Sequence, residues 1–338
     1  MRRILHTLKR FLGVCALLTF LFFIFSWYGV PERTNSVYGV TFATIMAREL
    51  SLDPRETYDA IVDDLGVRLI RLPIYWSDIE REKGKFDFSD YDYFMKKAEE
   101  KNVKLILVVG RKLPRWPECH IPEWSLSLSQ DEFQKAVEAQ IRVVVERYKN
   151  SSAVIRWQIE NEPFHIYGFG CADKKVTARD IDAEIALVRS LDSHPIMITD
   201  SGEQGIWVTA LRRVEYLGIS TYYQVWNDTL HVVRFPFGPG FYWLKAQLVG
   251  LFYPNGHIVV SELQAEPWGP VLLPHFDVAF QLELMNEARF REIIRRSRLA
   301  GFEENILWGA EWWYWLKKVE NKPGMWEEAR KVFNLYRT

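Results

Sequence analysis

Beyond residue 36, the chain alternates between short hydrophobic runs rich in β-branched residues and longer segments whose apolar positions recur at helical spacing. Several of the short runs, such as 105–109, are apolar throughout, which is typical of parallel strands buried on both faces. The predicted strands are 38–43, 67–72, 103–109, 154–159, 196–199, 217–221, 258–261 and 305–309. The predicted helices are 54–65, 91–101, 131–148, 178–191, 244–251, 280–299 and 326–336.

Eight strands, each followed by a helical segment over about 300 residues, predict an α/β fold of the (β/α)8 TIM-barrel type. A doubly wound open sheet is the alternative, but the first strand is not followed by the glycine-rich phosphate turn of that fold. No internal repeat or Pro/Ser-rich linker divides the segment, so we expect a single domain. In a TIM barrel the functional residues follow the carboxyl ends of the strands.

The N-terminal region has a different pattern, because no charged residue lies between Phe11 and Val30. About twenty such residues can span a bilayer. Four basic residues precede the run, which predicts a cytoplasmic N-terminus and an extracytoplasmic barrel. The run ends without the small residues of a signal-cleavage site, which favours an uncleaved signal anchor over a secreted protein with a cleaved leader. The expected organisation is a basic cytoplasmic tip (1–10), a single transmembrane helix (11–30), a short linker (31–36) and the barrel domain (37–338).

Composition restricts the partners of this domain. The formal net charge is −1, which argues against nucleic-acid binding through phosphate contacts. Aromatic residues make up 15% of the chain, including 14 Trp, which suits either a Trp-rich core or a surface on which ligands stack. Cys119 and Cys171 are the two cysteines outside the apolar run, and a disulfide between them is one possibility in an oxidising compartment. The histidines are scattered and there is no C-x-x-C motif, so we expect neither a metal nor an organic cofactor.

Carboxylates follow two of the predicted strands. Glu160 and Glu162 come after the fourth strand, and Glu262 ends the seventh, with Glu266 four residues beyond. Carboxyl groups at these two positions would face each other across the barrel mouth. Glycoside hydrolysis uses such a pair, in which one group protonates the leaving oxygen and the other attacks the anomeric carbon or activates water.

These motifs resemble the retaining glycoside hydrolases of clan A, barrel enzymes that include cellulases, mannanases and β-galactosidases. The resemblance rests first on Asn161-Glu162-Pro163 after strand four and on Glu262 at the end of strand seven. It implies that Glu162 is the acid/base, that Glu262 is the nucleophile, and that Asn161 contacts the sugar 2-hydroxyl. Glu160 and Glu266 remain alternatives for the two catalytic roles.

Further motifs occur in the same order as in the clan. Arg71 in the segment RLIRLP resembles the arginine beside the nucleophile, and Trp76 begins a WSDIE…GKFDF stretch similar to a signature of the β-galactosidase-like and cellulase-like members. The segment ISTYY resembles the strand that presents a tyrosine to the nucleophile; we prefer Tyr222 to Tyr223.

The aromatic and polar residues around the predicted mouth supply the remaining candidates for substrate binding. The segment ILWGAEWW resembles the aromatic end that floors the sugar subsite, which implies Trp308 and Trp312. His165, three residues after Glu162, is a candidate ligand of sugar hydroxyls. Asp200 and Glu203 either bind sugar hydroxyls or cap the next helix. The candidate stacking platforms in loops are Trp116, Trp124, Trp207 and Trp226.

The sequence therefore predicts a membrane-anchored, monomeric glycosidase that hydrolyses a β-linked oligo- or polysaccharide with net retention. Two alternatives from other classes stay open: a catalytically inactive barrel that binds glycan, and a membrane-tethered scaffold of the cell envelope whose aromatic residues form a protein interface.

Overall fold

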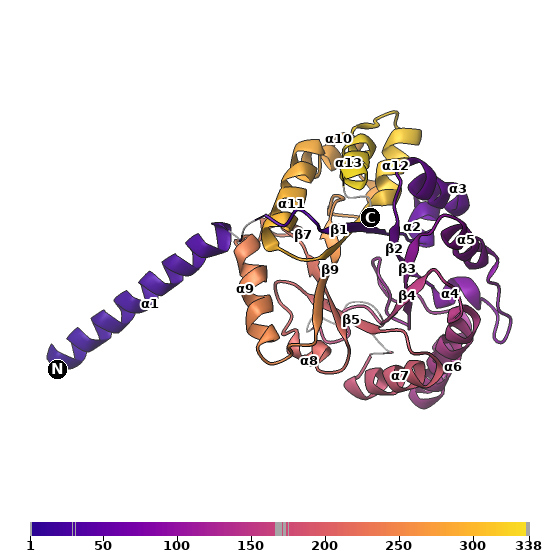
Figure 1. Cartoon of the computed structure of the whole chain (residues 1–338), viewed down its shortest axis with the longest axis horizontal. Helices are drawn as coiled ribbons and strands as arrows, with labels where there is room; N and C mark the ends of the chain where they lie inside the picture. Colours follow the sequence, from indigo (N-terminus) through magenta and orange to yellow (C-terminus); the bar gives the residue numbers. More distant parts are fainter. Residues whose placement is uncertain are drawn as a thin grey trace.

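The structure is a computed structural model that describes residues 2–28, 30, 32–165, 171, 174 and 176–335. Eight parallel strands close into a barrel in the order β1-β10-β9-β6-β5-β4-β3-β2, and helices surround it (Figure 1). The strands are β1 (Val37–Thr41), β2 (Leu69–Pro73), β3 (Lys104–Val109), β4 (Val154–Ile159), β5 (Ile196–Ser201), β6 (Tyr216–Thr221), β9 (His257–Gln264) and β10 (Glu304–Trp308). The eight predicted strands and the TIM-barrel fold are thereby confirmed.

Two groups of buried side chains hold the barrel together. Alternate residues of a strand point to opposite sides of the sheet, so one group lies inside the barrel and the other faces the helices. The inner group includes Leu69, Ile106 and Met197, none of which is more than 5% exposed. The larger group packs the outer faces of the strands against the helices and accounts for the continuous apolar runs in the sequence.

The helices cover the outer face of the barrel, and local signals set several of their ends. They are α2 (Thr44–Glu49), α3 (Pro54–Asp59), α4 (Trp76–Ile79), α5 (Ser89–Glu100), α6 (Gln130–Tyr148), α7 (Ala178–Leu191), α8 (Val208–Leu211), α9 (Pro239–Gly250), α10 (Val278–Leu284), α11 (Glu287–Ala300), α12 (Ala310–Lys318) and α13 (Gly324–Leu335). Helix α6 begins with a capping box in which Ser129 and Glu132 each bond the other's backbone N–H.

The structure differs from the predicted elements in several places. The helices α2, α4, α8 and α12 were not predicted. The helix expected at 280–299 is interrupted after Leu284, because the Asn286 side chain accepts a hydrogen bond from Arg289 N and starts α11 as a new helix. An antiparallel hairpin, β7 (Gln224–Asn227) and β8 (His231–Arg234), lies between β6 and α9 and was not expected. Its residues lack the strict alternation that identifies a strand from sequence.

The N-terminal helix α1 (Arg2–Tyr28) projects away from the barrel, and only its C-terminal end reaches the domain, next to α9 (Figure 1). Within the described residues, one helical segment, Lys9–Trp27, has the length and apolar composition needed to cross a membrane. The contact with the barrel is specific: Ser26 Oγ accepts a hydrogen bond from Gly238 N at 2.8 Å. The Phe22 and Phe25 rings pack against Phe241 and Trp243 of α9.

Candidate active site

The carboxyl ends of β4 and β9 bring the two predicted glutamates, Glu162 and Glu262, into one hydrogen-bond network at the mouth of the barrel. Asn161, two residues after the end of β4, is buried, and Glu162 next to it is partly exposed. Glu160 and Glu162 have φ angles of 55° and 41°. This left-handed backbone is uncommon for residues other than glycine and is often found at functional sites.

Both oxygens of the Glu262 carboxylate are held by strong donors. Arg71 Nη1 lies 2.7 Å from Oε1, and the Tyr222 hydroxyl donates to Oε2 at 2.5 Å. The Arg71 side chain is fully buried on β2, and its other nitrogens donate to Gln158 at 2.7 Å and to Asn161 Oδ1 at 2.8 Å. A carboxylate that accepts hydrogen bonds from a guanidinium and a phenol in this way is held in one orientation.

Glu162 occupies a different environment, although it lies nearby. Its Oε1 accepts a hydrogen bond from the Ser220 hydroxyl at 2.5 Å, and its backbone N–H donates to Thr199 Oγ1 at 2.8 Å. Ser220 on β6 is the register partner of Glu262 on β9, so the serine that bonds Glu162 lies on the strand position next to Glu262. Burial, followed by the negative charges of Glu262 and Glu118, raises the pKa of Glu162 to about 8.

A third carboxylate, which the sequence motifs did not indicate, borders this pair. Glu118 accepts a hydrogen bond from Asn161 Nδ2 at 3.1 Å and forms an ion pair with Lys112 Nζ at 2.5 Å. The Lys112 ammonium also donates to the Asn161 carbonyl at 2.7 Å. Burial raises the pKa of Glu118. Both residues belong to the irregular segment after β3, where no periodic pattern marks a side chain as functional.

A disulfide between Cys119 and Cys171 holds the loop that carries Glu118. It joins the segment after β3 to the segment after β4, so the two cysteines left open by the sequence are paired. Cys15 is the free cysteine of the described residues. The bridge fixes the residue next to Glu118, which restricts the position of that carboxylate relative to Asn161.

Glu160, the alternative acid, lies outside the network around Glu262. Its side chain is fully buried, and its carboxylate accepts the backbone N–H groups of Arg111 and Lys112 at distances of 2.5 to 3.1 Å. The Arg111 guanidinium faces it at 3.4 Å and also pairs with Glu184 at 2.8 Å. These contacts make Glu160 part of the support beneath the strand end.

The other carboxylates weighed from the sequence also have structural partners. Glu266, the alternative nucleophile, pairs with Arg115, which in turn contacts Glu311 at 3.1 Å. Asp200 accepts hydrogen bonds from Ser201 N and from Trp207 N, the residue before α8, both at 2.9 Å. Glu203 accepts hydrogen bonds from Tyr222 N at 3.1 Å and from the Tyr242 hydroxyl, and its pKa is raised by burial to about 7. Glu203 therefore supports the segment that presents Tyr222.

Two aromatic side chains flank the Tyr222 ring. The rings of Trp308 and Trp268 meet it edge-on, with centroid distances of 5.6 and 5.2 Å. Trp308 is half-buried under the Arg115 guanidinium, and within the described residues its buried indole nitrogen has no hydrogen-bond partner. Trp268 is 37% exposed and was not predicted as a binding residue. Both can present an apolar surface to a ligand next to Glu262.

Two predicted substrate-binding residues are placed in the interior, and their assignment is corrected. Trp76 and Trp312 have no exposed surface, and their indole nitrogens donate to Glu80 and Gln281 at 2.6 and 2.7 Å. Trp312 lies on α12 instead of continuing a strand, so the alternation assumed for strand eight does not reach it.

The remaining aromatic and histidine candidates have varied positions. Trp207 is fully buried, Trp124 packs edge-on against Trp76, and Trp116 is 52% exposed. Trp226 contacts His231 within the hairpin. His165 is half-buried and contacts Gln204 at 3.2 Å, and burial lowers its pKa. The His165 backbone N–H donates to the Glu162 carbonyl at 3.1 Å.

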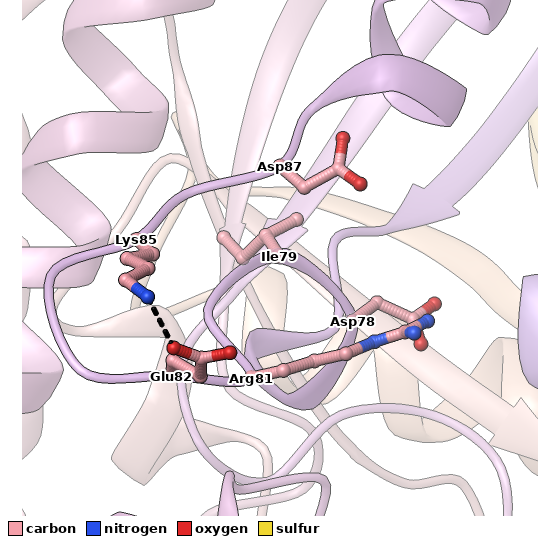
Figure 2. Close-up of a pocket in the computed structure, with 6 residues that line it drawn as sticks. All are labelled: Asp78, Ile79, Arg81, Glu82, Lys85 and Asp87. Carbon is pink, nitrogen blue, oxygen red and sulfur yellow. Dashed lines mark hydrogen bonds and ion pairs between the residues drawn. The ribbon is translucent and has the colours of Figure 1, made fainter.

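The signature stretch that begins at Trp76 has a supporting role. Glu80 accepts hydrogen bonds from the Trp76 indole and from Gly84 N, and the Glu80 carbonyl accepts one from the Trp124 indole. Figure 2 shows the surface hollow that this stretch forms, where Lys85 reaches Glu82 across the turn while Asp87 points away from them. The stretch thus braces the loop after β3.

The described residues contain no cluster of three or more His, Cys, Asp or Glu side chains arranged to hold a metal ion. The described residues do contain Glu162, a carboxyl group with a raised pKa, in the same network as Glu262, a carboxylate fixed by a guanidinium and a phenol. Two carboxyl groups in such different environments suit an acid and a nucleophile.

The barrel and this site resemble those of the clan A glycoside hydrolases, and comparison with known proteins supports that resemblance. A sequence model of glycosyl hydrolase family 10 matches residues 35–179, less than half of the chain, including β1 to β4 and the Asn161-Glu162 pair. A search of curated protein sequences gives no match.

Solved structures share the barrel fold at low sequence identity. An endo-β-1,4-xylanase of family 10 from Gloeophyllum trabeum has 14% identity and a TM-score of 0.54, over 82% of this chain and 86% of that protein. The GH5_18 protein of Streptomyces cattleya in complex with GlcNAc has 11% identity and a TM-score of 0.52, over 82% and 71%. A β-galactosidase from Halorubrum lacusprofundi has 14% identity and a TM-score of 0.53 over 80% of this chain, which spans about half, 52%, of that enzyme.

Proposed function

We propose that the protein is a retaining glycosidase that hydrolyses a β-linked glycan, with Glu162 as acid/base and Glu262 as nucleophile. The observation that carries the proposal is the contrast between the two carboxyl groups. Glu262 is held by Arg71 and Tyr222, whereas Glu162 has a pKa of about 8 and is protonated at neutral pH. The family 10 match over 35–179 supports the same reaction class.

In the first step, a Glu262 oxygen attacks the anomeric carbon while Glu162 gives its proton to the departing glycosidic oxygen. The aglycone leaves as an alcohol, and the sugar remains as an ester on Glu262. In the second step, Glu162 takes a proton from water, the water oxygen attacks the anomeric carbon, and the bond to Glu262 breaks. Two inversions at the same carbon give net retention.

Other residues of the network position the sugar and the carboxylates. We propose that Arg71 and Tyr222 orient Glu262, and that Asn161 contacts the sugar 2-hydroxyl, a bond expected to strengthen in the transition state. Trp308 provides an apolar face for the sugar ring next to Tyr222. Burial and the charge on Glu262 keep Glu162 protonated before the first step. Loss of that charge on ester formation lowers the pKa of Glu162, so that its carboxyl group is ionised and able to accept a proton in the second step.

We propose that α1 is an uncleaved membrane anchor and that the barrel is extracytoplasmic and monomeric. The basic residues before the apolar segment and the disulfide in the barrel support this orientation. The intact mass of the protein extracted from membranes tests the anchor. The full-length mass is expected, and a mature form lacking about 30 residues would indicate a cleaved leader instead.

The proposed activity is tested by incubating the full-length protein in detergent with β-glucan, β-mannan, β-xylan and aryl β-galactosides, with proton NMR to identify the anomer formed first. The β anomer is expected, and the E262A variant provides the inactive control. First release of the α anomer would overturn Glu262 as nucleophile. Glycan binding without hydrolysis would favour the inactive glycan-binding barrel, and absence of both would favour the envelope scaffold.

A further inference from the structure

A cavity of about 370 Å³ lies between the end of α1 and the wall of the candidate active site. Trp27 of α1, Arg234 of β8, and Arg289, Glu292 and Arg296 of α11 contribute to its lining. On the barrel side the cavity is lined by Tyr223, which follows β6, and by Gln264, the last residue of β9. The cavity thus joins the membrane-proximal helix to the strands that carry Tyr222 and Glu262.

The lining of this cavity is positively charged, although the domain as a whole is slightly acidic. Three arginines face a single carboxylate, Glu292, which pairs with Arg296 at 2.9 Å. Burial, together with the charges of Arg234 and Arg296, lowers the pKa of Arg289, so the guanidinium groups are close enough to repel one another. Arg234 is exposed at the end of the hairpin. Fixed, mutually repelling guanidinium groups gain free energy when an anion lies between them.

Aromatic rings hold one of these arginines in place. The Arg296 guanidinium lies 5.0 Å from the ring centres of both Trp27 and Tyr223. The Arg289 guanidinium is oriented by a hydrogen bond to the Gln224 side chain. Guanidinium groups that are already ordered lose less entropy on binding, and their planar forks match phosphate oxygens in pairs.

The position of the cavity indicates how an anion would reach it. Trp27 is the last residue of the segment that is apolar enough to cross a membrane, and it lines the cavity directly. Helix α9 lies on the same side of the barrel as α1 (Figure 1), and Leu248, Leu251 and Phe252 at its end are more than half exposed. A barrel held at a bilayer by α1 would therefore bring the cavity and this apolar end to the lipid surface.

We propose that the cavity binds a phosphate group carried by a membrane lipid, with Arg234, Arg289 and Arg296 as its ligands. The proposal rests on α1 as a membrane anchor, as proposed above, and does not depend on the glycosidase activity. Because Tyr223 and Gln264 line the cavity and lie one and two residues from Tyr222 and Glu262, an occupied cavity would brace the strand ends of the active site.

The test uses the full-length protein with C15S and A288C, labelled at position 288 on the exposed rim of the cavity with an environment-sensitive fluorophore. The protein is held in micelles of a polyoxyethylene detergent, which contains neither phosphate nor sugar. Phosphatidic acid, diacylglycerol with the same acyl chains, and inorganic phosphate are titrated separately. R234Q and R289Q are compared with R291Q as the control. Arg291 lies on α11 like Arg289, but it is exposed and pairs with Glu328 outside the cavity.

Phosphatidic acid is expected to give a saturable signal that diacylglycerol does not give. Loss of one charged hydrogen-bonding group should weaken binding about tenfold in R234Q and in R289Q and leave it unchanged in R291Q. If inorganic phosphate bound as tightly as phosphatidic acid, the proposal that the phosphate group is carried by a lipid would be overturned. A response to diacylglycerol, or an equal loss in R291Q, would overturn the phosphate site itself. Near-UV circular dichroism of each variant establishes that the barrel is folded, and the intact-mass experiment tests the anchor separately.

Discussion

Removing the hydroxyl group of Tyr222 isolates one of the two contacts that hold the proposed nucleophile. In Y222F the ring and its packing against Trp308 and Trp268 are retained, but the 2.5 Å hydrogen bond to Glu262 Oε2 is lost. Arg71 then remains as the partner on the other oxygen. The Glu262 carboxylate would rotate toward other donors and spend less time aimed at the anomeric carbon.

The expected effect follows from the type of bond removed. A buried hydrogen bond to a charged group contributes roughly 1.5–3 kcal/mol, and each 1.36 kcal/mol of activation free energy changes a rate about tenfold. We therefore expect Y222F to lower kcat/KM by about 10- to 150-fold. The midpoint of thermal unfolding should fall by only a few degrees, since the ring still fills its site.

Tyr223 provides a matched control, because the two tyrosines were difficult to separate by sequence. Its ring faces away from the carboxylates, packing against Tyr242 and under Arg296. The assay is hydrolysis of an aryl β-glycoside identified by the substrate screen, with both variants measured at the same pH. Y223F is expected to change kcat/KM by less than about threefold. A larger loss in Y223F than in Y222F would refute the assigned geometry, as would a Y222F variant with full activity.

Three further predictions concern the acid/base and its loop. The alkaline limb of kcat/KM should have its midpoint near pH 8, where Glu162 loses its proton. E118Q should move that midpoint to lower pH, because a negative charge near Glu162 is removed. An unchanged midpoint in E118Q would contradict the proposed effect of Glu118 on Glu162. Because the pKa of Glu162 in the folded protein lies above its ordinary value of 4.5, its contribution to stability is complete below pH 4.5 and is lost as pH rises through 8. In chemical unfolding from pH 5 to 9, E162Q should therefore lose less stability than the wild type. Parallel curves of unfolding free energy against pH for the two proteins would count against the raised pKa. Replacing Cys119 and Cys171 by serine should lower the free energy of unfolding by up to about 4 kcal/mol, because the disulfide restricts a loop of 52 residues in the unfolded chain. A change below about 1 kcal/mol would argue against the bridge.

The barrel and its two central carboxylates could be predicted because each depends on local sequence. A strand buried on both faces has a continuous apolar run in the sequence. The residues at the carboxyl end of such a strand lie at the barrel mouth irrespective of the conformation of the loops. Asn161, Glu162 and Glu262 lie at or just past the ends of their strands, whereas Arg71 lies in the middle of β2 and is indicated by its motif. Their contacts in the structure agree with the order of motifs along the chain.

The parts that could not be predicted depend on tertiary packing. Trp76 and Trp312 lie in the short helices α4 and α12, whose direction is set by neighbouring segments, so the pattern of the strands does not indicate their burial. Glu118 and Lys112 reach Asn161 only because an irregular loop folds back and is joined to a distant segment by the disulfide. Ser220 and Thr199 do lie at strand ends, and a systematic reading of small polar residues at these positions would have indicated them.

The central claim, that Glu262 is the nucleophile and Glu162 the acid/base of a retaining glycosidase, is tested most directly by azide rescue of E262A and E162A. With an activated aryl β-glycoside, E262A lacks the nucleophile, so azide should enter from the opposite face in one displacement and give the α-glycosyl azide. E162A still forms the ester on Glu262, so azide should give the β-glycosyl azide. Formation of the same anomer by both variants, or of neither, would contradict the assignment.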